Sequence, residues 1–190
     1  MTTVGIIIGS TRPGRVGEQI ASWVHEHTTV TNVSVDLIDL TEVALPFFDE
    51  TEHPSSGLYA HAHTRRWSQR IQPLDALVLV IPEYNYSYSA PVKNALDFLS
   101  AEWQRKPVAM VGYGMTSAGT RAVQALTPVV VALGMIPAGA VYLPLRDRID
   151  DAGRFQNTSH DDAGLDDLLA NMLGLQALLT PELRVASVAS

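Results

Sequence analysis

The sequence predicts an α/β fold in which a doubly wound, five-stranded parallel sheet carries helices on both faces. Five largely apolar runs alternate along the chain with segments of helical periodicity. Such runs are typical of strands buried on both faces, and strands that alternate with helices favour a parallel sheet with right-handed crossovers. A chain of 190 residues fits one domain with a substantial core. We therefore expect a single domain over residues 1–190.

The strands are expected at residues 4–9, 33–40, 74–81, 107–113 and 136–143. The second of these alternates polar and apolar residues before it turns apolar, and the other four are apolar almost throughout. Pro82 cannot donate a hydrogen bond to a sheet ladder. The third strand is therefore expected to end just before it.

Helices are expected between the strands, where apolar residues recur at helical spacing. They begin near residues 16, 63, 89, 117 and 161. Ser89 is the expected N-cap of the third helix, with Pro91 in its first turn. Thr116 or Ser117 is the expected N-cap of the fourth helix, and Pro128 inside that helix predicts a kink.

Two long stretches show no periodic pattern. Residues 41–56 hold Pro46, Pro54 and the adjacent Phe47-Phe48, and loops of this length in a compact domain are usually functional or interfacial. Residues from about 144 to 160 are polar, and they precede a C-terminal helix over about 161–179. The paired aspartates at 150–151 and 161–162 are expected to be solvated charges.

The composition narrows the function classes. The chain has no cysteine, so it can form neither disulfides nor thiolate metal sites. Its 13 basic and 20 acidic residues give a net charge of −7, which disfavours nucleic acid and anionic membranes as partners. No apolar run reaches the roughly 18 residues of a membrane span, and we expect a cytoplasmic protein. Charged residues make up 17 %, below the usual ~25 %, which indicates a buried sheet, a subunit interface or both.

Three loops follow strand ends, where doubly wound sheets bind their ligands. The first, residues 10–17, brings Ser10, Arg12 and Arg15 to the start of a helix. A helix N-terminus with guanidinium groups suits a phosphate. The loop lacks the Gly-Lys-Ser/Thr of a P-loop and the spacing of the dinucleotide fingerprint. It therefore points to a mononucleotide, and the alternative is a surface turn whose arginines are solvated.

The second and third loops differ in chemistry. Residues 82–89 hold three tyrosines among small polar residues, which suits a flat aromatic ligand; the alternative is that these are ordinary surface or interface tyrosines. Residues 112–119 bring small residues to a helix N-terminus. Close approach of the backbone to a ligand explains this loop, and so does a tight turn needed only for packing.

Several motifs in and beside these loops resemble those of the NADPH-dependent FMN reductase family. They are Gly-Ser-Thr-Arg-Pro-Gly-Arg at 9–15, Pro-Glu-Tyr-Asn-Tyr-Ser at 82–87, Lys-Asn-Ala-Leu-Asp at 93–97, Lys-Pro-Val at 106–108 and the glycine-rich turn at 112–119. The similarity covers residues from about 4 to 143. It implies a single flavodoxin-like, FMN-binding domain with strand order 2-1-3-4-5.

The resemblance also implies FMN as the bound cofactor and NADPH or NADH as the hydride donor. The first loop would hold the phosphate, the second would lie along the isoalloxazine with Asn85 facing its polar edge, and the third would close its other side. Many family members carry Ser or Asn where this chain has Val16-Gly17-Glu18, so backbone donors and the two arginines would hold the phosphate. The implied binding residues are Ser10, Arg12, Arg15, Val16, Gly17, Pro82, Glu83, Tyr84, Asn85, Tyr86, Ser87, Ser117, Ala118 and Gly119.

The implied reaction passes hydride from NAD(P)H to N5 of FMN, and then electrons to a quinone, free flavin, azo compound or similar small acceptor, by a ping-pong mechanism. No side chain is assigned an acid or base role, because the flavin performs the chemistry. Residues 41–56 are expected to supply walls to the site of a neighbouring subunit. We expect a homodimer or homotetramer.

Three alternatives remain from the residues alone. A flavodoxin-type carrier of single electrons fits the acidic composition, although its phosphate loop normally lacks arginines. A serine hydrolase would use Ser117, which lies in a glycine-flanked turn one residue too long for a nucleophile elbow. Three histidines suggest a metal, but His61 and His63 are two residues apart and would not share a helix face. With His53, they are expected to be solvated or interfacial.

Overall fold

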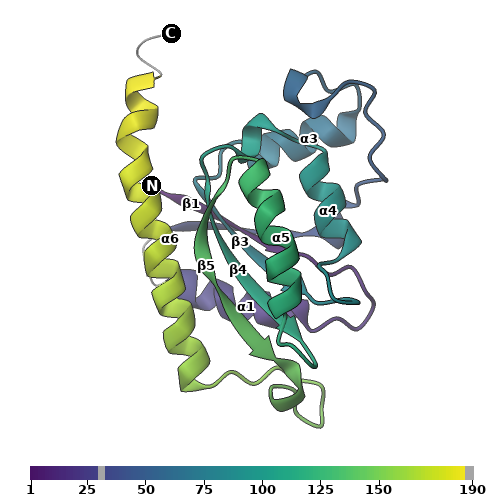
Figure 1. Ribbon diagram of the computed structural model, residues 1–190, viewed down its shortest axis with the longest axis vertical. Coiled ribbons are helices and arrows are strands. Elements are labelled where there is room, and N and C mark those ends of the chain that lie inside the picture. The colour runs from purple at the N-terminus through teal and green to yellow at the C-terminus, as the bar shows by residue number, and fades with distance from the viewer. Residues whose placement is uncertain (30–32, 187–190) are drawn as a thin grey trace.

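The computed structural model describes residues 1–29 and 33–186, and it shows the expected parallel sheet (Figure 1). Across the sheet the strand order is β2-β1-β3-β4-β5 and every neighbouring pair is parallel, so the predicted order 2-1-3-4-5 is confirmed. The strands are β1 (Thr3–Ile8), β2 (Ser34–Asp39), β3 (Ala76–Pro82), β4 (Pro107–Gly114) and β5 (Ile136–Pro144).

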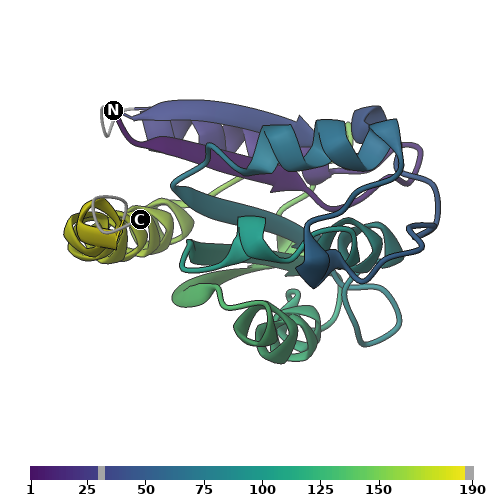
Figure 2. The same cartoon turned by 90° about the horizontal axis from the view of Figure 1, so that it is seen from above.

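Helices cover both faces of this sheet (Figure 2). On one face lie α1 (Gly17–Thr29) and α6 (Ser159–Ala186). On the other lie α3 (Ala62–Ile71), α4 (Ala90–Asp97) and α5 (Thr120–Ala132). All residues of β3 and β4 are buried, which explains their nearly continuous apolar sequence.

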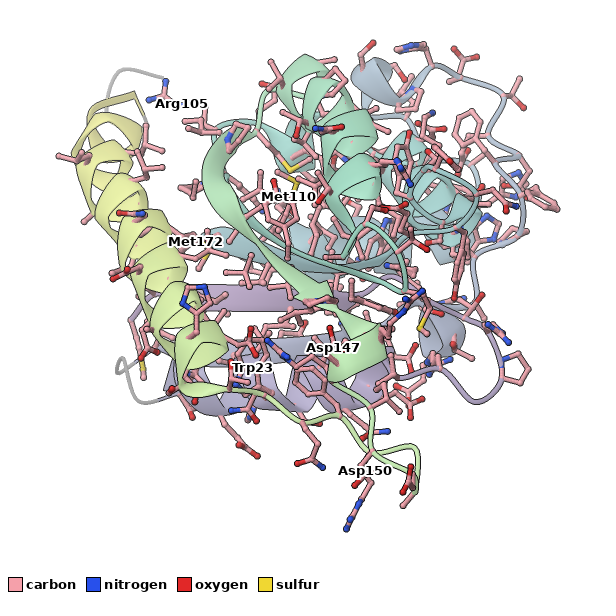
Figure 3. The ribbon with its side chains drawn as sticks, turned by 60° about the horizontal axis from the view of Figure 1, so that its bottom comes forward. Trp23, Arg105, Met110, Asp147, Asp150 and Met172 are labelled. Atoms are coloured by element: carbon pink, nitrogen blue, oxygen red, sulfur yellow. The ribbon has the colours of Figure 1, made fainter. Side chains whose placement is uncertain are left out.

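Alternation along each strand divides the core in two. Met110 of β4 packs on the α5 side, whereas Trp23 of α1 and Met172 of α6 belong to the cluster on the opposite face (Figure 3). The same alternation sends Tyr113 toward α1, together with Val111. This placement matters for the site described below.

The predicted helix starts and strand ends needed three corrections. Strand β3 continues through Pro82, which pairs with Tyr113 as the last residue of the strand. Ser89 is the N-cap residue of α4, but its hydroxyl donates to the carbonyl of Gly9 rather than to the helix. The N-cap of α5 is Gly119 and not Thr116 or Ser117, because the chain enters that helix through a left-handed residue with φ of 86°.

The two stretches without periodicity are ordered by short turns and buried acids. Residues 41–56 contain the end of α2 (Leu40–Val43) and the 3-10 turn η1 (Pro54–Ser56). Glu50 is buried there and accepts hydrogen bonds from the backbone N–H groups of Ala60 and His61, at 2.8 and 3.0 Å. This carboxylate fixes the path of the chain into α3.

After β5 the chain forms the 3-10 turn η3 (Leu145–Asp147) and a tight loop around Asp150, labelled in Figure 3. The expectation of solvated charge at 161–162 was wrong. Asp161 is 4 % exposed and pairs with Arg148 at 2.7 Å. Asp162 accepts from the indole of Trp23 at 2.8 Å. Burial raises the pKa of Asp161, but hydrogen bonds from Arg148 and Thr158 outweigh it and hold the pKa below its ordinary value.

Lys106 is buried beneath the C-terminal end of α3, where its Nζ donates to the carbonyls of Ile71 and Gln72. Burial lowers its pKa from 10.5 to about 8. Between these pH values the unfolded chain binds more protons than the native one, so this group makes stability rise with pH.

Lys106→Met tests this. From pH 7 to 9, the free energy of unfolding of the wild type should rise by about 1 kcal/mol more than that of the variant. Urea unfolding at each pH measures this, and a constant difference would contradict it.

Within residues 1–29 and 33–186, no helix combines the length and the apolar character that crossing a bilayer needs.

Candidate functional site

The three predicted loops meet at the C-terminal edge of the sheet, where side-chain hydrogen bonds join them. Ser10 of the first loop and Tyr84 of the second share a hydrogen bond of 2.7 Å between their hydroxyls. Ser117 of the third loop donates to Glu83 of the second. The chain runs from β1 to β2 on one side and from β3 to β4 on the other. The connections that leave β1 and β3 therefore diverge here, which is where doubly wound sheets bind ligands.

The first loop ends at the N-terminus of α1, whose first residues present backbone N–H groups to an anion. Ser10 is fully buried and its Oγ accepts from the backbone N–H of Arg12 at 3.4 Å. The side chain of Arg12 is exposed. Val16 and Gly17 form the start of the helix, and Gly17 is buried. The loop therefore combines a hydroxyl, backbone donors and one solvent-facing guanidinium.

Arg15 is placed differently from Arg12. Its guanidinium donates to Glu18, Asp39 and Thr41, and its side chain is only 10 % exposed. Two carboxylates thus neutralise this cation, and Glu18 is turned toward Arg15. The structure brings Arg15 to the loop but commits two of its nitrogens to protein partners.

The second loop folds into a tight turn over Tyr84–Ser87, closed by two backbone hydrogen bonds of 2.8 and 3.0 Å. Asn85 and Tyr86 both have positive φ, of 47° and 71°. Two successive residues with positive φ make a turn of the I′ kind, and this conformation costs free energy for residues other than glycine. The turn holds Tyr86 71 % exposed at the rim of the site.

Glu83 connects the second loop to the third. Its carboxylate accepts from the hydroxyl of Ser117, from the backbone N–H of Arg121 at 3.1 Å and from the guanidinium of Arg121 at 3.4 Å. The Arg121 guanidinium also lies 3.9 Å from the centre of the Tyr86 ring. The carboxylate therefore fixes the distance between the two loops, and Arg121 is a site residue that sequence reasoning missed.

The third loop is closed by backbone in unusual conformations. Ala118 and Gly119 both have positive φ, of 55° and 86°. The carbonyl of Ala118 accepts from the N–H of Leu143 at 3.1 Å. A Cβ on Gly119 would lie 2.2 Å from the backbone nitrogen of Tyr113. Packing against the end of β4 thus requires the glycine. A structural reason therefore accounts for Gly119, whether or not the loop also binds a ligand.

Tyr113 is the second residue that sequence reasoning missed. It is 4 % exposed, and among the described residues its hydroxyl has no hydrogen-bond partner. Burial and the neighbouring Tyr84 raise the pKa of this hydroxyl far above its ordinary value, so it remains a proton donor at any ordinary pH. Strand alternation was the available signal, since it places Tyr113 on the α1 face beside Val111.

A cavity of about 470 Å³ lies next to this site, between α2 and the first turn of α4. Its lining is mostly apolar and includes Leu40, Val43, Phe47 and Pro91. Thr11 is the lining residue that comes from the three loops. The polar groups that converge on one place belong to the loops, so we assign the functional site to the loops and regard the cavity as its neighbour.

The alternative chemistries find no matching geometry in the described part of the chain. Ser117 pairs with a carboxylate and a guanidinium, not with an imidazole, whereas a serine nucleophile needs a base. His61 is the N-cap residue of α3 and not part of the helix, so the helix-face argument does not apply to it, and its ring stacks on that of His63 with the ring centres 5.1 Å apart. Among these residues, His, Asp and Glu nowhere form a group of three or more suited to a metal ion.

Comparisons with known proteins identify relatives of this chain. A family model described as NADPH-dependent FMN reductase matches residues 2–147. The chain is 35 % identical over 162 residues to the NAD(P)H-dependent FMN reductase LOT6 of Saccharomyces cerevisiae, covering 74 % of this chain and 84 % of that protein.

Solved structures share the fold. The flavoenzyme NAD(P)H:(acceptor) oxidoreductase FerB of Paracoccus denitrificans matches with a TM-score of 0.72 at 18 % identity, over 92 % of this chain and 98 % of that one. A flavodoxin from the domain Archaea matches with a TM-score of 0.60 at 14 % identity, over 93 % and 99 % of the two chains. The fold is therefore flavodoxin-like.

Proposed function

The chain belongs to the NADPH-dependent FMN reductase family, and from this premise we propose that it passes hydride from NAD(P)H through FMN to a small electron acceptor such as a quinone, a free flavin or an azo compound. FMN and NAD(P)H are the cofactors of this family. When bound, FMN supplies the redox chemistry. The chain supplies binding, orientation and a shaped access to the ring.

One observation carries the proposal: the hydrogen bond of 2.7 Å between Ser10 and Tyr84 joins the first loop, proposed to hold the phosphate, to the second loop, proposed to hold the ring. Ser10, Arg12 and the backbone of Val16 and Gly17 would hold the phosphate, with Arg15 as support. The ring would lie along Pro82, Glu83, Tyr84, Asn85, Tyr86 and Ser87, with Ser117, Ala118 and Gly119 on its other side.

Several features of the structure support the binding of FMN at these loops. The N-terminus of α1 offers unpaired backbone donors to an anion, and the buried Tyr113 hydroxyl beside it lacks a partner among the described residues. The second and third loops are fixed relative to each other by Glu83. Tyr86 of the second loop and Met115 of the third are 71 % and 59 % exposed, and a ring bound beside them would keep one face open to the solvent.

We propose that donor and acceptor use this open face in turn, which gives ping-pong kinetics. Holding two reacting atoms about 3–3.5 Å apart is the main contribution that such a site can make. Tyr84 and Tyr86 are positioning residues in this proposal, and no side chain transfers a proton during the reaction. The carboxylate of Glu83, in the second loop, accepts hydrogen bonds that tie this loop to the third.

We propose that the working form is a homodimer or homotetramer in the cytoplasm, and exposed apolar side chains support the association of subunits. Phe47 and Phe48, adjacent in the stretch that follows α2, are 85 % and 41 % exposed. Neighbouring exposed apolar side chains on one segment often mark an interface. We propose that residues 41–56 of one subunit cover the open ring face of another, while residues 1–190 of each form one FMN-binding domain.

The absorption spectrum of the purified protein and a titration with FMN test this proposal first. We expect a yellow protein, or a colourless one that turns yellow by binding one FMN per chain, and steady NAD(P)H oxidation once a quinone is added. Failure to bind FMN would refute the proposal. Binding of FMN without NAD(P)H oxidation would favour a flavodoxin-type carrier of single electrons.

Arg12→Ala tests the phosphate half-site. Its guanidinium is the exposed cation of the first loop, so we expect the Kd for FMN to rise about 10-fold or more, in line with charge-assisted hydrogen bonds. The turnover of FMN-saturated enzyme should change little, because Arg12 belongs to the loop proposed to hold the phosphate and not to the loops proposed to hold the ring. Arg66→Ala, which removes an exposed arginine of α3, is the matched control. Equal losses of affinity and saturated turnover would contradict an anchoring role.

A further inference from the structure

The buried hydroxyl of Tyr113 poses a question that the proposed function leaves open. Tyr113 is the last residue but one of β4, and its side chain reaches beneath the N-terminus of α1. A Cβ built on Gly17 would lie 2.7 Å from the Tyr113 hydroxyl oxygen, so only the glycine leaves room for this group directly under the first turn of the helix. The hydroxyl is thus placed at the phosphate half-site.

Buried polar groups are almost always hydrogen-bonded, and an unpaired one in a native protein calls for an explanation. The Ser10 hydroxyl lies close enough to Tyr113 to lower the pKa of its hydroxyl in part, but Ser10 is bonded to Tyr84 and makes no hydrogen bond of ordinary geometry to Tyr113. Arg15 lies close enough to influence the hydroxyl electrostatically. The Nε of Arg15 is also buried without a partner among the described residues. Two unused donors therefore lie at the one loop that is suited to an anion.

We propose that the Tyr113 hydroxyl donates a hydrogen bond to the phosphate of FMN and makes the site select the phosphorylated flavin over riboflavin. This inference rests on the proposed function. Tyr113 enters from the sheet side of the loop, whereas Ser10 and Arg12 lie within the loop itself. The phosphate thereby gains a donor from beneath, and the buried hydroxyl gains the acceptor that it lacks.

Tyr113→Phe removes only this hydroxyl and leaves the ring that packs against α1. The Kd for FMN should rise about 10-fold or more, as expected for a lost hydrogen bond to a charged group. The Kd for riboflavin, which carries no phosphate, should stay within about twofold. The melting temperature of the cofactor-free variant should equal or exceed that of the wild type, because an unpaired buried hydroxyl has been removed.

Tyr59→Phe is the matched control, since the Tyr59 hydroxyl donates to Glu102 at 2.9 Å, outside the three loops. It should lower the melting temperature of the cofactor-free protein and leave the ratio of the two flavin Kd values unchanged. These affinities are measured by quenching of flavin fluorescence, and the melting temperatures by calorimetry.

The outcomes separate this inference from the function beneath it. A wild-type protein that binds neither flavin refutes the proposed function and the inference together. If the wild type binds FMN but Tyr113→Phe weakens FMN and riboflavin equally, or weakens neither, the hydroxyl is no phosphate donor. A cofactor-free variant that melts well below the wild type would show that the hydroxyl has a structural partner, and this too would overturn the inference.

Discussion

Gly119→Ala is expected to lower the free energy of unfolding by about 3–5 kcal/mol, at the upper end of single substitutions. A Cβ at this position would lie 2.2 Å from the nitrogen of Tyr113 and 2.3 Å from the carbonyl carbon of Gly112. Both contacts are with the backbone of β4, which is buried throughout. Neither can move without breaking its pairing with β3 or β5, and the φ of 86° adds strain for any residue with a Cβ.

Thermal unfolding of the two proteins measures this, with an expected fall of roughly 10–15 °C for a chain of this size. Gly57→Ala is the matched control. Gly57 also has a left-handed backbone, with φ of 67°, but nothing lies within 4 Å of the added Cβ. Its cost should be about 1 kcal/mol, the cost of the conformation alone. Similar losses in the two variants would show that backbone conformation, and not contact with β4, sets the cost at Gly119.

Glu83→Ala is expected to weaken FMN binding by about 30-fold or more and to cost about 2–3 kcal/mol of stability. The substitution leaves the Ser117 hydroxyl and the backbone N–H of Arg121 without the acceptor that they now share. The Glu83 side chain is only 9 % exposed, so the loss falls among half-buried donors, where each unpaired group is costly. The second and third loops would no longer be held at a fixed separation.

Flavin titration and urea unfolding follow the two effects of Glu83→Ala. Glu52→Ala, which removes an exposed acid of the 41–56 stretch, is the control for charge. Glu83→Gln should be intermediate, because an amide oxygen accepts hydrogen bonds but carries no charge for Arg121. Unchanged FMN affinity beside a loss of stability would mean that the separation of the loops is irrelevant to the ligand.

The sheet was predictable because its determinants are local. Apolar runs such as residues 76–81 indicate strands buried on both faces. The helices between them are indicated by the helical spacing of their apolar residues. The N-cap of α5 was not predictable in this way. Ser117 has the chemistry of a cap, but its hydroxyl is taken by Glu83, which lies 34 residues earlier in the chain. The preference of Ser for N-cap positions depends on the local sequence, whereas its partner here is distant in the sequence.

Within the site, the sequence identified the three loops but not how their charges are shared. Arg15 was expected to face a phosphate, yet Asp39 and Glu18 hold it. Asp161 was expected in water, yet Arg148 holds it in the interior. In both cases the deciding contact joins residues whose proximity depends on the folded chain. Tyr113 could not be predicted for the opposite reason: its hydroxyl is buried without a hydrogen-bond partner among the described residues, which only the structure can show.

The hydrogen bond between Ser10 and Tyr84 has a thermodynamic consequence. The Ser10 hydroxyl has one proton, so if it donates to a phosphate, as the proposed function requires, it can only accept from Tyr84. Inorganic phosphate and riboflavin, which represent the two halves of the cofactor, would then be coupled ligands. Whatever factor phosphate imposes on the affinity for riboflavin, riboflavin must impose on the affinity for phosphate. The proposed site would thus bind the two halves of its cofactor as linked ligands.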